Sequence, residues 1–268
     1  MKHQSLNYGH AKFQKRLRPV NGIQMYYEIH GAGRPLVLIH GGGSTISTSF
    51  GRILPLLAKK YQVIAMELQA HGHTSDRDAP ESFAQDADDV AELLRQLNIS
   101  EADILGFSNG GQTAMQLAMS HPQKVRKLIV ASAFYNRDGT PEGFWEGMQN
   151  ATFDDMPQVY KDAFLRIKND PAALLNMFRK DCQRMQNFTG WSDDDLKSIQ
   201  APTLLISGDH DVVSPEHSAE MFRLIPHCRL AILPGGHGTY LGELATLTDG
   251  KWNQDYALPL IEQFLDAS

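Results

Sequence analysis

Residues 102–111 read ADILGFSNGG, and this stretch decides the fold of the chain. The apolar run that ends at Phe107 predicts a buried strand, and the sequence that follows Ser108 predicts a helix. Ser108 is therefore expected at the corner between the two elements, with Gly106 two residues before it and Gly110 two residues after it. A strand that turns directly into a helix leaves no room for side chains at these two positions. Glycine permits the turn and exposes the serine hydroxyl.

Further strands are predicted on both sides of this stretch. Residues 22–29 have a strand-favouring composition and predict an edge strand. A continuous apolar run, which is typical of a strand buried on both faces, occupies residues 35–39, and residues 63–66 predict another buried strand. Residues 127–132, 202–207 and 230–233 predict three further strands.

Helices are predicted between these strands. Apolar residues at helical spacing predict a helix over residues 48–59, and Ser82 with Gln85 forms a capping-box motif that begins the next one. Ser214 followed by Pro215 is typical of another helix start. Strands that alternate with helices predict an α/β fold, with a mostly parallel, doubly wound sheet and helices on both faces.

The alternation is interrupted between residues 136 and 200. This segment is predicted to be helical and contains eight aromatic residues: Phe144, Trp145, Phe153, Tyr160, Phe164, Phe178, Phe188 and Trp191. We expect most of them to pack against one another and against nearby methionines. The predicted organisation is an N-terminal arm over 1–19, a core over 20–135 and 201–268, and an inserted helical segment over 136–200.

Composition narrows the functional classes. The chain has 268 residues and a formal net charge of −6, which disfavours binding to nucleic acid. Apolar runs are too short to span a membrane, and the first nineteen residues are polar and basic, unlike a signal peptide. Cys182 and Cys228 are far apart and are expected to be free thiols in a reducing compartment. The composition predicts a cytoplasmic protein with neither a nucleic-acid partner nor a membrane partner; it leaves the oligomeric state open.

Polar clusters follow four of the predicted strands: residues 40–44, Ser108, residues 208–211 and His237. The carboxyl ends of parallel strands meet at one edge of a sheet, where ligands bind. A serine hydroxyl becomes a nucleophile when an imidazole takes its proton, and a carboxylate must orient that imidazole. His237, on a glycine-rich loop after the last strand, is the histidine placed to reach Ser108. Asp209 or Asp211 supplies the carboxylate.

This arrangement resembles the α/β-hydrolase fold superfamily, in the branch of serine esterases and carbon–carbon bond hydrolases with a helical cap. The resemblance rests on the Gly-x-Ser-x-Gly elbow and on the chain order serine, acid, histidine, and it spans roughly residues 20–267. It implies that residues 136–200 form a cap or lid. Members of the family read Gly-x-x-Asp at the acid, which favours Asp211 over Asp209 and predicts the triad Ser108, Asp211 and His237.

The resemblance also implies an oxyanion hole, which consists of two preorganised N–H donors. Asn109 follows the nucleophile and supplies one, and Gly42 supplies the other, with Gly43 as the alternative. The glycines of this loop could instead bind a phosphate, but neither Gly-Lys-Ser/Thr nor Gly-x-Gly-x-x-Gly is present. For binding substrate we expect Gly43 and, from the cap, Trp145 and Phe164.

One loop departs from the family. Related sequences often read Asp-x-Arg-Gly-x-Gly-x-Ser where residues 67–75 read ELQAHGHTS, so the arginine and one glycine are missing. His71 and His73 in this loop lack a third ligand at zinc-like spacing, so we expect no metal there. His40 ends a buried strand and is expected to anchor its loop.

The predicted function is hydrolysis of a carboxylic ester with a hydrophobic acyl or aromatic group, through an acyl-enzyme and without a cofactor. Cleavage of a carbon–carbon bond, lactone hydrolysis and acyl transfer would use the same triad. Serine at position 108 argues against the dehalogenase and epoxide-hydrolase branches, which have aspartate there. A non-catalytic ligand receptor on this fold is the third hypothesis.

Overall fold

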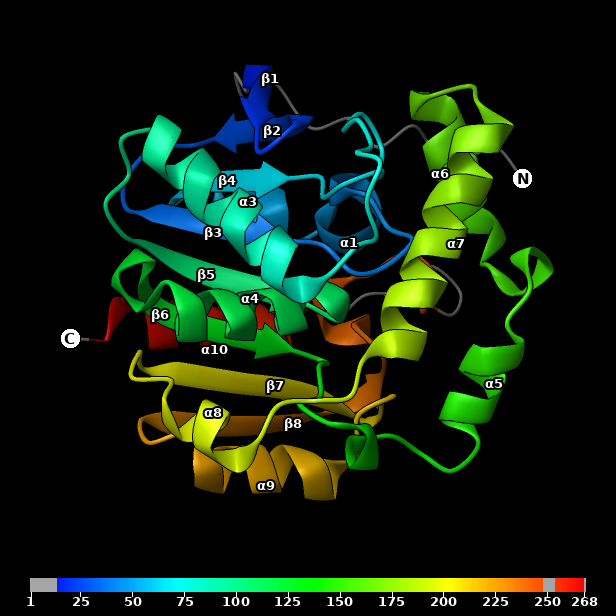
Figure 1. Cartoon of the computed structure of the whole chain (residues 1–268). Coiled ribbons are helices and arrows are strands. Elements are labelled where there is room, and N and C mark those ends of the chain that lie inside the picture. The colour runs from blue at the N-terminus through cyan, green and yellow to red at the C-terminus, as the bar shows by residue number, and fades with distance from the viewer. Residues whose placement is uncertain (1–13, 248–253, 268) are drawn as a thin grey trace.

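A computed structural model describes residues 14–247 and 254–267, and these residues form a single sheet of eight strands flanked by helices (Figure 1). The sheet order is β1-β2-β4-β3-β5-β6-β7-β8, with β1–β2 and β2–β4 antiparallel and the remaining pairs parallel. The strands are β1 (Gln14–Val20), β2 (Ile23–His30), β3 (Pro35–Ile39), β4 (Gln62–Met66), β5 (Ala102–Phe107), β6 (Val125–Ala131), β7 (Thr203–His210) and β8 (Cys228–Gly236). The predicted α/β fold with a mostly parallel sheet is confirmed.

Helices cover both faces of the sheet and one of its edges. The α-helices are α1 (Ile46–Phe50), α2 (Leu54–Leu57), α3 (Phe83–Gln96), α4 (Asn109–Ser120), α5 (Phe144–Asn150), α6 (Gln158–Ile167), α7 (Pro171–Asn187), α8 (Asp193–Lys197), α9 (Pro215–Leu224) and α10 (Gln254–Asp266). Short 3₁₀ turns are η1 (Pro122–Lys124), η2 (Arg137–Gly139), η3 (Phe153–Asp155) and η4 (Thr239–Leu241). Among the described residues, none of the helices is both long and apolar enough to cross a membrane.

Two apolar clusters, one on each face, hold the helices to the sheet. One cluster joins the strands to α3, α4, α8 and α9, and the other joins them to α1, α2 and α10. Residues 36–39 of β3 are all fully buried, which explains why this strand reads as a continuous apolar run. Burial on both faces fixes the central strands, and with them the edge at which their carboxyl ends meet.

The N-terminal arm predicted over residues 1–19 is partly wrong. Residues 1–13 lie outside the described part of the chain, but Gln14–Val20 form β1, which pairs antiparallel with β2. The two strands are joined by Asn21 and Gly22, both with positive φ (42° and 90°), as a two-residue hairpin turn requires. The Asn-Gly pair is the sequence signal that the prediction overlooked.

The helix predicted over residues 48–59 is two short helices, α1 and α2. The apolar spacing identified the buried face correctly, because Phe50, Ile53, Leu54 and Leu57 are all fully buried. Pro55 stands in the first turn of α2. Its ring would clash with the carbonyl four residues earlier in a continuous helix, so the chain breaks before it.

Two predicted helix starts are found. Ser214 caps α9 by accepting a hydrogen bond from the His217 N–H, with Pro215 at the first helical position. Ser82 caps α3 in the same way through the Gln85 N–H. The Gln85 side chain, however, bonds Asp89 rather than reaching back, so the predicted capping box is only half made.

Between β6 and β7 the chain forms a separate helical layer. Helices α5, α6 and α7 lie beyond the carboxyl ends of the parallel strands, on the right in Figure 1. The chain enters and leaves this layer at one point, where the Trp191 N–H donates to the Tyr135 carbonyl at 2.9 Å. A Cβ on Gly190 would lie 2.7 Å from Asn136 Cβ, so the two chain segments touch there. After this neck, α8 packs on the sheet beside α9.

Candidate active site

The turn between β5 and α4 is as tight as the sequence suggests. Ser108 has φ 54° and ψ −126°, a backbone conformation that side-chain-bearing residues rarely adopt. A Cβ on Gly106 would lie 2.0 Å from the Gly110 carbonyl oxygen, and one on Gly110 would lie 2.1 Å from the Ile39 carbonyl oxygen. The glycines therefore let the helix start pack directly on the backbone of β5 and of the neighbouring strand β3.

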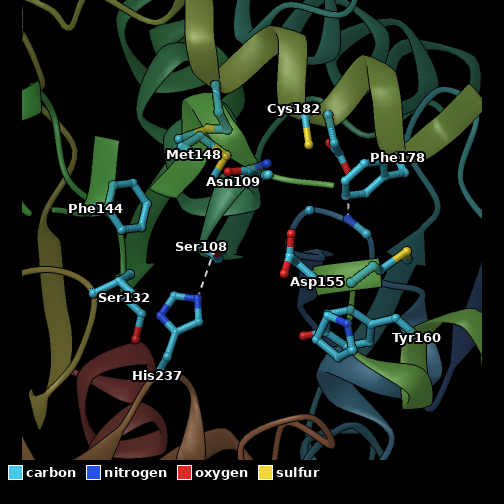
Figure 2. Close-up of a pocket in the computed structure, with 18 of the residues that line it drawn as sticks. Ser108, Asn109, Ser132, Phe144, Met148, Asp155, Tyr160, Phe178, Cys182 and His237 are labelled. Carbon is cyan, nitrogen blue, oxygen red and sulfur yellow. Dashed lines mark hydrogen bonds between the residues drawn. The ribbon is translucent and has the colours of Figure 1, made fainter. Parts of the chain in front are cut away.

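Ser108 faces His237 at the edge of the sheet. His237 Nε2 lies 3.0 Å from Ser108 Oγ, and His237 Nδ1 lies 2.6 Å from Asp211 Oδ1 (Figure 2 shows the first of these contacts). The three side chains come from the ends of β5, β7 and β8, which converge there. This is the geometry in which an imidazole can take the serine proton while a carboxylate orients the imidazole.

Asp211 is held from several directions. Its Oδ2 accepts hydrogen bonds from Ser132 Oγ at 2.5 Å and from the Gly208 N–H at 2.9 Å. Burial raises the pKa of Asp211, but the hydrogen bond and charge of His237 and the bonds from Ser132 and Gly208 outweigh burial, so the pKa lies below its usual value. The carboxylate is thereby kept ionised beside the imidazole.

Asp209, the other candidate acid, points elsewhere. Its side chain is half exposed, and its Oδ1 accepts from the Gly235 N–H at 2.8 Å. It therefore ties the ends of β7 and β8 together. Ser132 was not singled out from the sequence, although it follows β6 at the same edge and has the positive φ (53°) that brings its hydroxyl to Asp211.

The loop after β3 lies against the elbow. A Cβ on Gly42 would lie 2.4 Å from Asn109 Nδ2, so Gly42 packs directly on the residue after Ser108. In the described part of the chain the Gly42 N–H donates to no other group, and the Asn109 N–H is at the first position of α4, where helical N–H groups lack a partner. The Gly43 N–H is already taken, because it donates to Asp181 Oδ2 at 2.5 Å.

A cavity of about 350 Å³ separates the sheet edge from the helical layer, and Ser108 and His237 open into it. Its apolar walls are formed mainly by Phe134, Phe144, Met148, Met156, Phe178 and Met185. In Figure 2, Phe144 and Met148 flank Ser108, while Tyr160 and Phe178 lie across the cavity.

Two residues predicted to bind substrate do not line this cavity. Trp145 packs against Phe144 and Phe134 and donates its indole N–H to the Arg137 carbonyl. Phe164 is fully buried in a cluster with Met156 and Met177. Both contribute to the packing of the helical layer. Trp145 lies beside the cavity-lining Phe144 in the sequence, but neighbouring positions on a helix face different sides. The third predicted residue, Gly43, does line the cavity.

Gln112 is a cavity residue that sequence reasoning missed. It lies one helical turn after Ser108 on α4 and is almost fully buried. Its Nε2 has no hydrogen-bond partner among the described residues. An amide placed in this way can hydrogen-bond a bound molecule; its spacing of four from Ser108 was the available signal.

A sequence profile described as "alpha/beta hydrolase fold" matches residues 34–172, which is more than half of the chain. The chain belongs to the α/β-hydrolase fold family. It is 27% identical over 242 residues to a putative non-heme chloroperoxidase of Synechocystis, which covers 80% of this chain and 88% of that protein. It is likewise 27% identical to the human serine hydrolase BPHL, over 83% of this chain and 79% of that protein.

The same fold is present in a solved meta-cleavage product hydrolase from Pseudomonas fluorescens IP01. The two structures agree with a TM-score of 0.75 over 94% of this chain and 97% of that one, at 24% sequence identity. This similarity supports the fold, and the relatives support a hydrolase.

Residues 67–75, the loop in which this chain departs from the family pattern, supply one member of a buried ion pair. His71 is fully buried, and its Nε2 lies 2.9 Å from Asp181 Oδ2 on α7. Ala70 has φ 63°, a conformation that favours glycine, at the position where related sequences have one. No cluster of three potential metal ligands occurs among the described residues, and His73 contacts Glu67 instead.

His40 hydrogen-bonds its own loop and the adjoining one. Its Nδ1 lies 2.7 Å from the Gly41 carbonyl oxygen, and its Nε2 accepts from the Leu68 N–H at 3.0 Å. Burial lowers the pKa of His40 to about 3, with the charge of His71 acting in the same direction. The neutral ring links the loop after β3 to the loop after β4, as a loop anchor does.

Proposed function

We propose that this protein is a serine hydrolase that cleaves a small carboxylic ester with a hydrophobic acyl or aromatic group. The observation that carries the proposal is the chain of contacts from Asp211 through His237 to Ser108, at 2.6 Å and 3.0 Å, at the floor of an apolar cavity. A carboxylate, an imidazole and a hydroxyl in consecutive contact are what nucleophilic catalysis requires, whereas a binding protein does not need this arrangement.

The reaction would proceed in two halves. His237 Nε2 takes the proton of Ser108 as Oγ attacks the ester carbonyl, and the negative charge that forms on the carbonyl oxygen is received by the N–H groups of Gly42 and Asn109. His237 then passes the proton to the departing alkoxide, leaving an acyl group on Ser108. A water molecule, deprotonated by His237, attacks this acyl-enzyme. The bond between the acyl carbon and Ser108 Oγ breaks, His237 returns the proton to Oγ, and the acid is released. Asp211 stabilises the imidazolium in both halves.

The chemistry of the cavity supports an apolar substrate portion. Aromatic and methionine side chains form most of its wall, and a volume of about 350 Å³ suits a short acyl chain or one aromatic ring. Its lining also includes polar residues besides Ser108 and His237, namely Asn109, Gln112, Ser132, Asp155, Tyr160 and Asp181.

A panel of p-nitrophenyl esters from acetate to hexanoate tests the proposal. We expect the specificity constant to rise with acyl length until the cavity is full, and Ser108→Ala to abolish both turnover and labelling by a fluorophosphonate. Labelling that persists in Ser108→Ala would place the nucleophile elsewhere.

Two further substrates, run beside the esters, separate the rival reactions. Rapid consumption of a vinylogous ketoacid or a lactone, with slow turnover of every ester, would replace ester hydrolysis by carbon–carbon bond cleavage or lactone hydrolysis. A small ligand that raises the melting temperature without being consumed would indicate a receptor.

A further inference from the structure

Asp181 connects the helical layer to the loop that carries the proposed oxyanion donor. It stands on α7, lines the cavity and is almost fully buried. Its Oδ2 accepts from the Gly43 N–H at 2.5 Å and contacts His71 Nε2 at 2.9 Å, while its Oδ1 accepts from Arg184. One carboxylate thus contacts α7, the 67–75 loop and the loop after β3.

The loop held by Asp181 is a tight turn. The Ser44 N–H donates to the Gly41 carbonyl at 3.3 Å, and Gly43 has φ 65° within this turn. The hydrogen bond from Gly43 fixes the peptide plane between Gly42 and Gly43. The Gly42 N–H belongs to the preceding peptide, so its direction depends on the same turn.

The groups around Asp181 keep it charged. His71 Nδ1 lies 2.7 Å from the Gln69 carbonyl oxygen, and its Nε2 faces the carboxylate, so both ring nitrogens meet acceptors and both need a proton. Burial alone would raise the pKa of Asp181, but the charges of His71 and Arg184 hold it far below its usual value. A charged acceptor makes a stronger hydrogen bond to Gly43 than a neutral one would.

We propose that Asp181 is a positioning residue. When α7 packs against the sheet edge, the Asp181 carboxylate binds the Gly43 N–H and thereby aligns the oxyanion loop. This inference rests on the proposed hydrolase function. Asp181 does not touch the reacting atoms in this scheme. It sets the direction of the donor that does.

The test compares Asp181 with its neighbour Lys180, which anchors the same helix elsewhere. Lys180 Nζ donates to Asp76 at 2.7 Å and to the Arg77 and Ala79 carbonyls, away from the cavity. With p-nitrophenyl butyrate, we expect Asp181→Ala to lower kcat at least tenfold and change KM less than threefold. Removal of a whole oxyanion donor costs about 10²–10³ in kcat, and a misaligned donor retains part of that.

Two further variants complete the design. Asp181→Asn keeps an acceptor oxygen for Gly43 and should restore kcat to within about threefold of the wild type. Lys180→Ala should leave kcat unchanged. If Asp181→Ala does not fold because it leaves the buried His71 imidazolium without its carboxylate, the double variant Asp181→Leu with His71→Met removes both charges and should show the same loss of kcat.

An equal loss of kcat in Lys180→Ala and in the Asp181 variants would overturn the inference, since the effect would then be general loosening of α7. A change in KM alone would overturn it as well. If the wild type cleaves no ester, the proposed function fails. The role of Asp181 is then tested by the rate at which a fluorophosphonate labels Ser108. The phosphonyl oxygen occupies the oxyanion position, so the rate should fall in Asp181→Ala and not in Lys180→Ala.

Discussion

Asp211 with His237 and Asp181 with His71 are the same two kinds of side chain, paired at the same edge of the sheet at 2.6 Å and 2.9 Å. They differ in what lies beyond the imidazole. The second nitrogen of His237 meets the Ser108 hydroxyl, which can donate or accept, whereas that of His71 meets the Gln69 carbonyl, which only accepts.

The second partner therefore decides what each pair can do. The Nε2 of His237 faces a hydroxyl group rather than a second fixed acceptor, and its side chain reaches the cavity. His71 is fully buried and needs both of its protons, so it acts as a fixed cation. The comparison teaches that an imidazole–carboxylate pair alone does not identify a catalytic base. The group on the far nitrogen does.

The largest effect is expected where the carboxylate of the proposed catalytic pair is neutralised. Asp211→Asn should lower kcat by about 10⁴, because the amide no longer holds the imidazole in the tautomer that accepts the serine proton. Asp209→Asn is the matched control and should change kcat by less than a few fold. Steady-state kinetics on a p-nitrophenyl ester measure both, and the opposite ranking would assign the acid to Asp209.

The next prediction compares the same substitution at each of the two histidines. His237→Gln should abolish turnover and leave the melting temperature nearly unchanged, since its side chain is partly exposed. His71→Gln should lower the free energy of unfolding by about 3 kcal/mol, because it breaks a buried ion pair. This corresponds to a fall in melting temperature of roughly 6–12 °C. Thermal unfolding followed by circular dichroism checks both. Equal stabilities would contradict the distinction between the pairs.

A third prediction uses the pH dependence of stability. Burial would lower the pKa of His71, but the charge and hydrogen bond of Asp181 and the charge of Glu81 overcome it and raise the pKa to about 9. A histidine with a raised pKa stabilises the folded state fully below its unfolded value, near 6.5, and loses that contribution as pH rises through about 9.

The neighbouring groups act in the same direction. Burial raises the pKa of Glu81 to about 8, against the charge of Arg184, so stability falls as pH rises from about 4.5 to about 8. Burial likewise raises the pKa of Asp86 to about 6, so its part of the decline is complete below pH 7. His40 is neutral in this range. We expect the melting temperature to decline from pH 7 to 9.5, with a shallower decline in His71→Gln. Parallel curves for the two proteins would refute a charged His71.

The smallest effect concerns the cavity wall next to the catalytic pair. Phe144→Ala should shift the preferred acyl chain to a longer one, since each buried methylene is worth about 0.8 kcal/mol, or roughly fourfold in specificity constant. Trp145→Ala, one residue along α5, should leave the preference as it is, because Trp145 faces away from the cavity. The ester panel measures both variants, and a shift in Trp145→Ala alone would mean that the cavity extends in another direction.

Local sequence rules were sufficient for the sheet and for the elbow. The apolar runs give the buried strands, and the glycines around Ser108 report a backbone packed against backbone. The sequence could not predict which aromatic residue of α5 lines the cavity, because composition does not tell which way Phe144 and Trp145 face. His71 and Asp181 are separated by 110 positions, so no local pattern connects them. The Asn21-Gly22 hairpin, by contrast, was present in the sequence and could have been found.

The neck of the helical layer has a consequence for how this chain can be altered. Tyr135 and Trp191 are joined by a hydrogen bond, and the crossover to β7 is completed by α8 after that point. Residues between them thus form a closed loop that adds nothing to the connectivity of the sheet. Such a loop is an exchangeable module. A shorter or longer insertion with the same two ends would keep the order of the strands. It would also have to replace the carboxylate that Asp181 gives to the Gly43 N–H, so recombination at this neck would alter the cavity wall and the loop after β3 together.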